Sequence, residues 1–548
     1  MPTVTLSKKA VEELMGTRLP LEELKDRISM LGTDLDGIKG DEIQVEIFPN
    51  RPDMLSEQGF ARALASFIGK KTGLAEFKVN KSKYEVKVEK AVSKVRPHTV
   101  CAVIKNLKFD DEKIREIIQI QEKLHIGMGR NRKKLAIGMY PMEAIKFPIT
   151  YTAKKPNDIK FLPLEAKREM TGMQILSGHP TGRDYGHLLE GYNLFPIFID
   201  DVGEIMSMPP IINSEKTGKI GLSTTDVFIE CSGFDLRVLK QCLNILVTVM
   251  SDMGGDIYEV AVKYESKTEI TPNLKPVEWN LDLDYVNKII GMNFSKKEIK
   301  ELLERMGHEY KNNKVLVPAY RTDILHEIDL AEDIAIAYGY DNFKPEIPNV
   351  STIGQESQIE ILKKKVANIL IGSGLIETIS YHLISKESHN NKMNYDCKVV
   401  ELSNSSTSEY NTMRRWIVPS IMQILSRNTN KEYPQNIFEM GVVFKPSKAQ
   451  ETGVDEHVNL GVGLCGPEMD FTAIKQIFDT IMDALDLEYE TEEIEHSSFI
   501  KGRTAAIKVK GKEIAIMGEI HPQTTTNFGI EMPIAALEMD LIIIKEVL

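Results

Sequence analysis

The chain contains 548 residues, of which 42% are hydrophobic and 27% are charged, and this composition is typical of a folded, soluble protein. The length exceeds what one hydrophobic core can organise, so we expect roughly three to five folded units. The sequence lacks an apolar run of about 18 residues and begins without the apolar core of a secretory signal, so we expect a cytoplasmic protein without membrane contact.

The net charge of −12 argues against a protein that coats nucleic acid over its whole surface. Contact with RNA would need a local basic patch or a basic partner, because Lys and Arg bind phosphates. One such patch is Gly129-Arg130-Asn131-Arg132-Lys133-Lys134, for which a solvated charged turn is the simpler interpretation. The five cysteines show no C-x-x-C spacing and predict neither a disulfide framework nor a thiolate zinc site.

Residues 1–90 predict a small α+β module. Its expected elements are strands at 4–6 and 42–48 and helices at 7–16, 19–32 and 56–69. Ser7 is the expected N-cap of the first helix, and Gly32 is expected to close the second. Pro49 and Pro52 frame a turn before the third helix.

Residues 91–268 predict a mixed α/β module, preceded by a charged stretch at 80–98 that we interpret as a separator. Its strands are expected at 99–107, 133–140, 194–201 and 226–231, and its helices at 111–125 and 236–254. Residues 269–345 form a small unit that ends in a strong helical pattern. Residues 346–548 mix helices with short strands and with hairpin turns such as Lys510-Gly511-Lys512.

The segment from Arg321 to Asp333 is rich in carboxylates. If a helix begins near His326, three of them (Asp329, Glu332 and Asp333) fall on one face, with Asp323 in the preceding turn. Like charges at this spacing destabilise an isolated helix by a few tenths of a kcal/mol per pair. We therefore expect a compensating positive charge, either Mg²⁺ or basic side chains of a partner. The alternative is that the acidic residues simply favour the positive end of a helix.

Two further segments could carry a ligand. Gly461 to Gly466 satisfies the G-x-G-x-x-G pattern of a dinucleotide site, which would suggest an NAD(P)-binding oxidoreductase. Pro467 and Glu468 separate these glycines from the next helix, so a strand that passes close to another backbone is the better interpretation. The segment 208–214 contains two adjacent prolines, which stiffen the chain. Asn213 and Ser214 at its end would then be fixed beside an apolar wall, as in a ligand pocket; a simple rigid loop is the alternative interpretation.

Several segments resemble the β subunit of phenylalanyl-tRNA synthetases of the archaeal/eukaryotic type, and they follow the family's order along nearly the whole chain. The segments that carry this resemblance are 48–56, 207–215, 321–340, 402–425, 438–444, 502–507 and 518–541. The inserted oligonucleotide-binding module and the C-terminal anticodon-binding domain of the bacterial form have no counterpart here, which we interpret as the shorter organisation.

The resemblance implies a multidomain α/β and α+β fold. Its expected parts are an N-terminal α+β module (1–90), an editing module of mixed α/β structure (91–268), a small helical module (269–345) and a class II synthetase-like antiparallel sheet with helices (346–548). The last module would be a catalytically degenerate scaffold, and Arg414 and Arg415 would be structural or interface residues.

The resemblance also implies a function in a heterotetramer of two α and two β chains. The α subunit would use ATP and L-phenylalanine to charge tRNA-Phe. Mg²⁺, shared with the α subunit, would be bound by four residues of the acidic segment, namely Asp323, Asp329, Glu332 and Asp333.

The middle module would hydrolyse tRNA-Phe mischarged with tyrosine, because a pocket for an apolar ring rejects an added hydroxyl poorly. The expected editing residues are Asn213, Ser214, Glu230 and Asp235, which should recognise the phenol and orient a water. A free-standing tRNA-editing hydrolase is the main alternative function.

Overall fold

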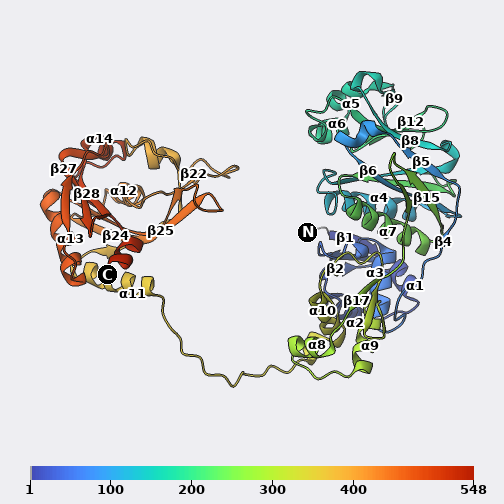
Figure 1. Ribbon diagram of the computed structural model, residues 1–548, viewed down its shortest axis with the longest axis horizontal. Helices are drawn as coiled ribbons and strands as arrows, with labels where there is room; N and C mark the ends of the chain where they lie inside the picture. The colour runs from blue at the N-terminus through green and yellow to red at the C-terminus, as the bar shows by residue number, and fades with distance from the viewer. Residues whose placement is uncertain (1–2) are drawn as a thin grey trace. The chain divides into compact units, whose positions relative to one another are not determined.

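The computed structural model describes residues 3–548, and the chain divides into two compact units, Met1–Ile347 and Pro348–Leu548 (Figure 1). Strands and helices are mixed in both units, as expected for a multidomain α/β and α+β protein. Among the helices of residues 3–548, none combines the length and apolar character that crossing a bilayer requires.

The first part of unit 1 is a three-stranded antiparallel sheet with helices. The strand order is β1-β3-β2. The elements are β1 (Thr3–Ser7), α1 (Lys8–Met15), α2 (Leu21–Met30), β2 (Asp34–Lys39), β3 (Glu42–Glu46) and α3 (Glu57–Phe67). Ser7 caps α1 by accepting a hydrogen bond from the Ala10 backbone N–H, which confirms the predicted start. Helix α2 ends at Met30, and Gly32 follows with a φ of 91°.

The middle of unit 1 is built on an 11-stranded sheet with the main order β13-β12-β11-β8-β5-β15-β6-β14-β7. Strands β4 and β16 also pair with β15. The strands are β4 (Val79–Asn80), β5 (Glu85–Val88), β6 (His98–Lys105), β7 (Leu135–Pro141), β8 (Ile149–Lys154), β11 (Phe195–Ile199), β12 (Ile205–Met208), β13 (Ile212–Asn213), β14 (Val227–Gly233), β15 (Asp256–Lys263) and β16 (Thr268–Thr271). A separate pair joins β9 (Lys160–Phe161) and β10 (Met170–Thr171).

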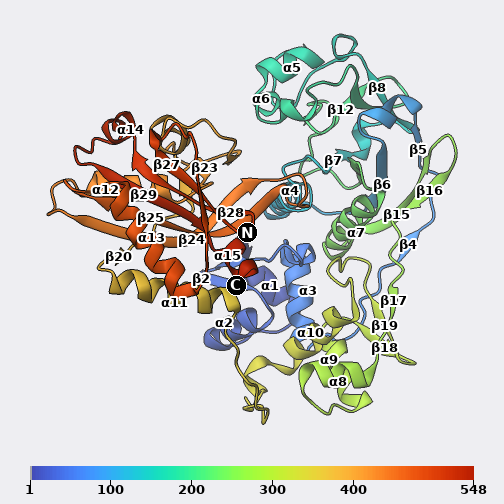
Figure 2. The same ribbon diagram turned by 60° about the vertical axis from the view of Figure 1, so that its left-hand side comes forward.

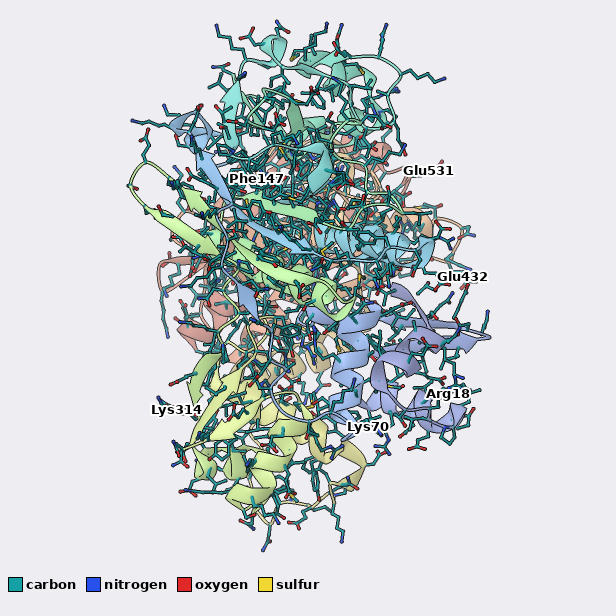
Figure 3. All side chains as sticks on the ribbon, turned by 90° about the vertical axis from the view of Figure 1, so that its right-hand side faces the viewer. Arg18, Lys70, Phe147, Lys314, Glu432 and Glu531 are labelled. Carbon is teal, nitrogen blue, oxygen red and sulfur yellow. The ribbon has the colours of Figure 1, made fainter. Side chains whose placement is uncertain are left out.

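Helices complete this part: α4 (Asp111–Ile126), α5 (Gly172–Gly178), α6 (Pro180–Tyr185) and α7 (Leu236–Asp252). Helices α4 and α7 confirm the two helices predicted for this region. On the other face of the sheet, aromatic rings pack together, with Phe147 between Tyr84 and Phe228 (Figure 3).

The observed sheet begins before, and ends after, the boundaries predicted for the middle module. Strands β4 and β5 lie before residue 90 and pair with β15, so the charged stretch is part of the sheet and no separator. Val86 and Val88 alternate with Glu85 and Lys87 and point into the core, a pattern that the high charge of the stretch concealed. Strand β16 extends the sheet to Thr271, beyond the boundary expected at residue 268.

The last part of unit 1 combines three helices with a small antiparallel sheet of order β17-β19-β18. Its elements are β17 (Val277–Asn280), α8 (Leu283–Ile290), α9 (Lys296–Arg305), β18 (Glu309–Lys311), β19 (Lys314–Val317) and α10 (Glu327–Tyr338). One hydrophobic core joins the first, middle and last parts of unit 1 and includes Leu64 of α3, Leu243 of α7 and Ile334 of α10. Two further cores lie within the middle part.

Unit 2 contains a seven-stranded sheet of order β20-β24-β25-β29-β28-β27-β26, antiparallel except for the β20–β24 pair (Figure 2). Its strands are β20 (Ile376–Glu377), β24 (Gln435–Pro446), β25 (Val454–Cys465), β26 (Glu490–Glu493), β27 (Phe499–Val509), β28 (Lys512–Ile520) and β29 (Ile534–Asp540). A second, three-stranded sheet joins β21 (Leu383–Ile384), β22 (Val400–Glu401) and β23 (Thr412–Met413). The hairpin predicted at Lys510-Gly511-Lys512 joins β27 and β28 and is confirmed.

The helices of unit 2 pack into two separate hydrophobic cores. One core contains residues of α11 (Gln358–Gly372), α13 (Phe471–Leu485) and α15 (Leu541–Val547). The other contains residues of α12 (Val418–Arg427), and α14 (Pro522–Asn527) is the remaining helix. Arg414 is fully buried and pairs with Glu439, while its Nε donates to the Val442 carbonyl oxygen at 2.9 Å. The structural role expected of Arg414 is therefore confirmed.

The G-x-G-x-x-G pattern lies almost entirely within the long strand β25, so the dinucleotide interpretation is wrong. Gly461 and Gly463 face helix α12, whose side chains pack directly against the strand. A Cβ at Gly461 would lie 2.7 Å from Cγ2 of Ile417, and one at Gly463 would lie 2.5 Å from Cγ2 of Ile421. The glycines allow close approach of a helix, as the strand interpretation expected.

We predict that Gly461→Val destabilises unit 2 by about 2 kcal/mol, because the added side chain has no room beside Ile417. The measurement is urea unfolding followed by fluorescence of Trp416 in a Trp279→Phe background, which leaves one tryptophan. Gly372→Ala in α11 is the matched control, since a Cβ at Gly372 would have nothing within 4 Å and alanine favours a helix. Equal unfolding midpoints for both variants would contradict this packing.

Candidate functional site

Helix α10 begins where the sequence predicted, directly after His326. Asp329 occupies the third helical position, where its Oδ2 accepts hydrogen bonds from the backbone N–H groups of His326 at 2.8 Å and Leu325 at 2.7 Å. The His326 ring in turn accepts from the Ile328 N–H at 3.1 Å. These reciprocal bonds form a capping box, so Asp329 fixes the start of the acidic helix.

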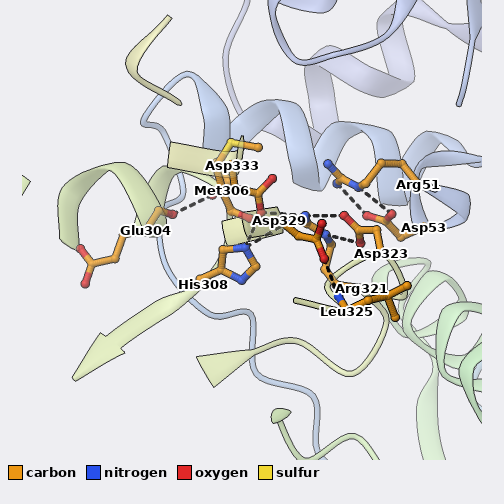
Figure 4. A network of polar contacts seen from close by, with 11 residues as sticks. Arg51, Asp53, Glu304, Met306, His308, Arg321, Asp323, Leu325, Asp329 and Asp333 are labelled. Carbon is orange, nitrogen blue, oxygen red and sulfur yellow. Dashed lines mark hydrogen bonds and ion pairs between the residues drawn. The ribbon is translucent and has the colours of Figure 1, made fainter. Parts of the chain in front are cut away.

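The other end of the acidic segment is organised by one arginine (Figure 4). Arg321 forms a bidentate pair with Asp323, through Nε to Oδ1 at 2.9 Å and Nη2 to Oδ2 at 2.7 Å. The same Nη2 donates to Oδ2 of Asp333 at 2.7 Å, and Nε2 of His308 lies 2.7 Å from that oxygen. Arg321, His308 and Asp333 are all buried. The positive charge that the carboxylates require is thus supplied in part by this chain itself.

The pKa shifts follow from this arrangement. Burial opposes ionisation of Asp333, but the charge of Arg321 and the hydrogen bond of His308 outweigh it and hold the pKa of Asp333 below its usual range. Burial lowers the pKa of His308, so this ring is neutral and its Nε2–H donates to Asp333. At the exposed Glu332, partial burial and then the negative charges of Asp333 and Asp329 raise the pKa.

The four predicted metal ligands therefore belong to one acidic cluster. They differ in which of their carboxylate oxygens already accept hydrogen bonds. Within residues 3–548, the hydrogen bonds of Asp329 and Asp333 involve only Oδ2, and those of Asp323 involve both oxygens. No group of three or more metal-binding side chains in that range surrounds a common point.

Sequence reasoning missed Arg321 and His308, although Arg321 stands only two residues before Asp323. Their role depends on β18, β19 and α10 packing together, which no local pattern reveals. A second buried pair lies beside them: Arg51 donates to Asp53 through Nε and Nη2, both at 2.9 Å. The Arg51 and Arg321 charges influence each other, so the two pairs form one electrostatic group.

A second candidate site is a cavity of about 490 Å³ in the middle part of unit 1. Helix α4, strands β7 and β14, and the loop around the Pro209–Pro210 pair line it. Isoleucines form part of the wall, including Ile114, Ile117 and Ile211. Polar and charged side chains line the rest, so the cavity offers both apolar surface and hydrogen-bonding groups to a ligand.

Glu230 is the distinctive polar group of this cavity. It is buried on β14, with Oε1 3.3 Å from the Tyr140 hydroxyl, which itself donates to Ser207 at 2.8 Å. In the described part of the chain, Oε2 of Glu230 is buried without a hydrogen-bond partner. Burial raises the pKa of Glu230 to about 8, although Arg96 and Tyr140 oppose the shift. At neutral pH the side chain is therefore mainly an uncharged acid, able to donate or accept.

Of the four predicted editing residues, the structure brings two together. Asn213 and Glu230 line the cavity, whereas Ser214 and Asp235 do not. Ser214 is buried beneath its loop and accepts from the Lys216 N–H at 3.3 Å. Asp235 caps α7 by accepting from the Arg237 N–H at 2.9 Å. Both have structural roles because their oxygens bond their own backbone, and proximity in sequence did not reveal this.

Most polar residues of the cavity wall were not predicted as site residues, and His125 and Arg132 are two of them. His125 is buried, and its Nε2 accepts from the Ile137 N–H at 2.8 Å, which places the ring proton on Nδ1 beside Glu122. Burial lowers the pKa of His125, so it is a neutral positioning group. Arg132 donates to the Ile211 carbonyl oxygen at 3.0 Å and to Glu122 at 2.9 Å. In the sequence, the only indication of a role for Arg132 was its place in the predicted basic patch.

Comparison with protein families covers three segments of the chain. The model described as "Phe-tRNA synthetase beta subunit B1 domain" matches residues 1–70. The model "tRNA synthetase B5 domain" matches 279–340, which includes the acidic helix. The model "Phenylalanyl tRNA synthetase beta chain CLM domain" matches 344–541.

Whole-chain relatives agree with these matches. The chain is 38% identical over 551 residues to the phenylalanine–tRNA ligase beta subunit of Pyrococcus abyssi, covering 99% of both chains. It is also 38% identical to the protein of that name in Methanocella arvoryzae, covering 100% of both. A crystal structure of an N-terminal fragment of the phenylalanyl-tRNA synthetase β-subunit from Pyrococcus horikoshii superposes with a TM-score of 0.60 and 38% identity, covering 62% of this chain and 99% of the fragment. The chain therefore belongs to the family of phenylalanine–tRNA ligase beta subunits.

Proposed function

We propose that this chain acts in the cytoplasm within a heterotetramer of two α and two β subunits that charges tRNA-Phe with L-phenylalanine. ATP and phenylalanine are bound and activated on the α subunit. The observation that carries this proposal is the similarity to phenylalanine–tRNA ligase beta subunits along 99% of both chains. The buried Arg414–Glu439 pair in unit 2 supports a scaffold role there, because its guanidinium is already fully engaged.

The acidic cluster is the proposed Mg²⁺ site at the junction with the α subunit. Asp323, Asp329, Glu332 and Asp333 are the ligand set, with the α subunit or water completing it. The donor chemistry fits, because Mg²⁺ takes carboxylate oxygens together with water. Arg321 pairs with Asp323 and Asp333 but with neither Asp329 nor Glu332, and the pKa of Glu332 is raised by partial burial and then by its negative neighbours.

The residues of this chain prepare that site. Arg321 and His308 hold Asp333 and keep it ionised, while the capping box holds Asp329 at the helix start. Glu332 stays exposed on the next turn. The ion, when bound, supplies positive charge that offsets the carboxylates and links them to the partner.

Neutralising the outward carboxylates should weaken assembly. For the double variant Asp329→Asn/Glu332→Gln, we predict that the Mg²⁺ concentration for half-maximal association with α rises at least tenfold, since two ligands lose their charge. Asparagine preserves the capping acceptor, so the helix start is retained. Analytical ultracentrifugation over a Mg²⁺ titration measures the effect.

The matched control is Glu301→Gln/Glu304→Gln on the neighbouring helix α9, which removes the same charge from carboxylates that only pair with Lys297 and Lys300. This control should assemble like the parent. An acidic-helix variant with the same Mg²⁺ dependence as the control would sink the metal assignment.

The cavity around Glu230 is the proposed editing site, where tyrosyl-tRNA-Phe is hydrolysed. The apolar walls accept an aromatic ring, and the unpaired Oε2 of Glu230 meets the phenol hydroxyl. A phenylalanyl group would leave that oxygen buried and unpaired, which costs about 1–3 kcal/mol and excludes the correct product. Asn213 offers an amide that can position a water beside the ester.

Removing the acid should impair hydrolysis. We predict that Glu230→Ala lowers kcat/KM for tyrosyl-tRNA hydrolysis by about 10- to 100-fold, in line with one lost buried hydrogen bond. Glu230→Gln should retain part of the activity, because an amide also donates and accepts. The assay is release of labelled tyrosine from preformed tyrosyl-tRNA by the α₂β₂ complex.

Asp235→Asn serves as the control in the same module, since asparagine caps a helix as well as aspartate does. Its hydrolysis rate should match that of the parent complex. Parental activity in Glu230→Ala would instead rule out the proposed recognition of the phenol.

The raised pKa of Glu230 also predicts a pH-dependent stability. The usual glutamate pKa is 4.5 and burial raises it to about 8, so the folded state retains a proton that the unfolded state releases. Stability of the parent relative to Glu230→Gln should therefore fall as pH rises from about 5 to about 8, by on the order of 4 kcal/mol, and then level off. Urea unfolding of both proteins across this range measures it, and a constant difference would contradict the buried neutral acid.

The alternative of a free-standing editing hydrolase is less favoured. Such an enzyme needs the middle module but has no use for unit 2, which matches a β-chain family model over residues 344–541.

A further inference from the structure

The basic patch noted in the sequence is a rigid loop between α4 and β7, and we call residues 129–134 the basic loop. Arg130, Asn131 and Arg132 all have left-handed backbone conformations, with φ values of 46°, 53° and 63°. Three successive non-glycine residues rarely adopt this conformation unless their surroundings enforce it.

Backbone bonds enforce the shape of the basic loop. The Arg132 N–H donates to the His125 carbonyl oxygen at 3.1 Å, and the Lys134 N–H donates to the Gly129 carbonyl oxygen at 2.8 Å. A Cβ at Gly129 would lie 2.4 Å from the His125 oxygen, so glycine is required there. The loop is a fixed structure at the end of α4, unlike a freely solvated turn.

Arg132 joins this loop to the wall of the cavity. Its guanidinium bonds the Ile211 carbonyl oxygen and Glu122, and it lies over the Tyr185 ring at 4.3 Å from the centroid. Arg132 and Glu230 line the same cavity. The basic loop is therefore continuous with the rim of the proposed editing site.

The remaining basic side chains of the loop face solvent. Arg130, Lys133 and Lys134 are exposed, and none of them forms an ion pair with any residue in the described part of the chain. Other lysines of this module are paired with carboxylates; they include Lys160, Lys216, Lys219, Lys240, Lys263 and Lys267. A cluster of unpaired positive charges at a cavity rim stands out on a chain of net charge −12.

We propose that the basic loop binds the backbone phosphates of the single-stranded 3′ end of tRNA while the terminal aminoacyl nucleoside occupies the cavity. This inference rests on the proposed editing function. The terminal nucleoside ester enters the cavity and the phosphates before it remain outside, where free cations can replace their counterions. A rigid array of such cations holds a strand with little ordering cost, so Arg130, Lys133 and Lys134 form the RNA contact beside the cavity.

The test compares two substrates with the α₂β₂ complex: tyrosyl-tRNA-Phe and the tyrosyl ester of adenosine, which has no phosphate. For Lys133→Ala/Lys134→Ala, kcat/KM on the tRNA substrate at low salt should fall about tenfold or more. The slope of log kcat/KM against log salt concentration should become shallower by about 1.4, because each single-strand phosphate contact contributes about 0.7. The loss should be confined to the substrate that carries phosphates.

The matched control is Lys154→Ala/Lys155→Ala, a pair of exposed lysines at the end of β8 in the same module. This control should show the same salt slope as the parent. The variant Lys133→Arg/Lys134→Arg should also show the parental salt slope. A loop variant whose salt slope equals that of the control overturns the inference. Glu230→Ala separates the two hypotheses: it should slow hydrolysis of both substrates, and parental rates on both would refute the editing site itself.

Discussion

The buried charge of Arg321 is the constraint on which the acidic site depends. A guanidinium removed from water must be paired on several sides, and Asp323 and Asp333 do this together from either side of the α10 start. The pairing fixes the loop after β19 to the helix, and the adjacent Arg51–Asp53 pair joins the same electrostatic group from the N-terminal module. With Asp323 and Asp333 held by Arg321, Asp329 and Glu332 form the more exposed part of the acidic face. The internal pairing thereby determines which oxygens can meet a partner or an ion.

The two candidate sites use carboxyl groups in opposite ways. Asp333 is buried among positive and hydrogen-bonding groups, which hold its pKa low and keep it charged. Glu230 is buried beside Tyr140, and burial raises its pKa to about 8 and keeps it mainly neutral. The first arrangement organises charge at a surface, as an interface requires. The second gives the cavity a neutral acid with an oxygen that has no hydrogen-bond partner within the described residues, which suits discrimination between two aromatic rings that differ by one hydroxyl.

Local elements could be predicted from the sequence because their signals are local. The cap at Ser7, the start of α10 after His326, the hairpin at Gly511 and both long helices of the middle module follow from capping, turn and periodicity rules. The partners in the sites could not be predicted in this way. Tyr140 meets both Glu230 and Ser207, and Arg321 meets Asp333, only because segments distant in sequence come together in the fold. Ser214 and Asp235, which were predicted from nearness along the chain, do not line the cavity, since nearness along the chain does not decide which way an oxygen points.

The central claim is that this chain is one half of an aminoacyl-tRNA ligase. The most direct measurement is phenylalanine-dependent exchange of pyrophosphate into ATP, made on the purified chain before and after addition of its α partner. The account predicts no exchange by the chain alone and robust exchange once α₂β₂ forms. Exchange at full rate without any second polypeptide would contradict it.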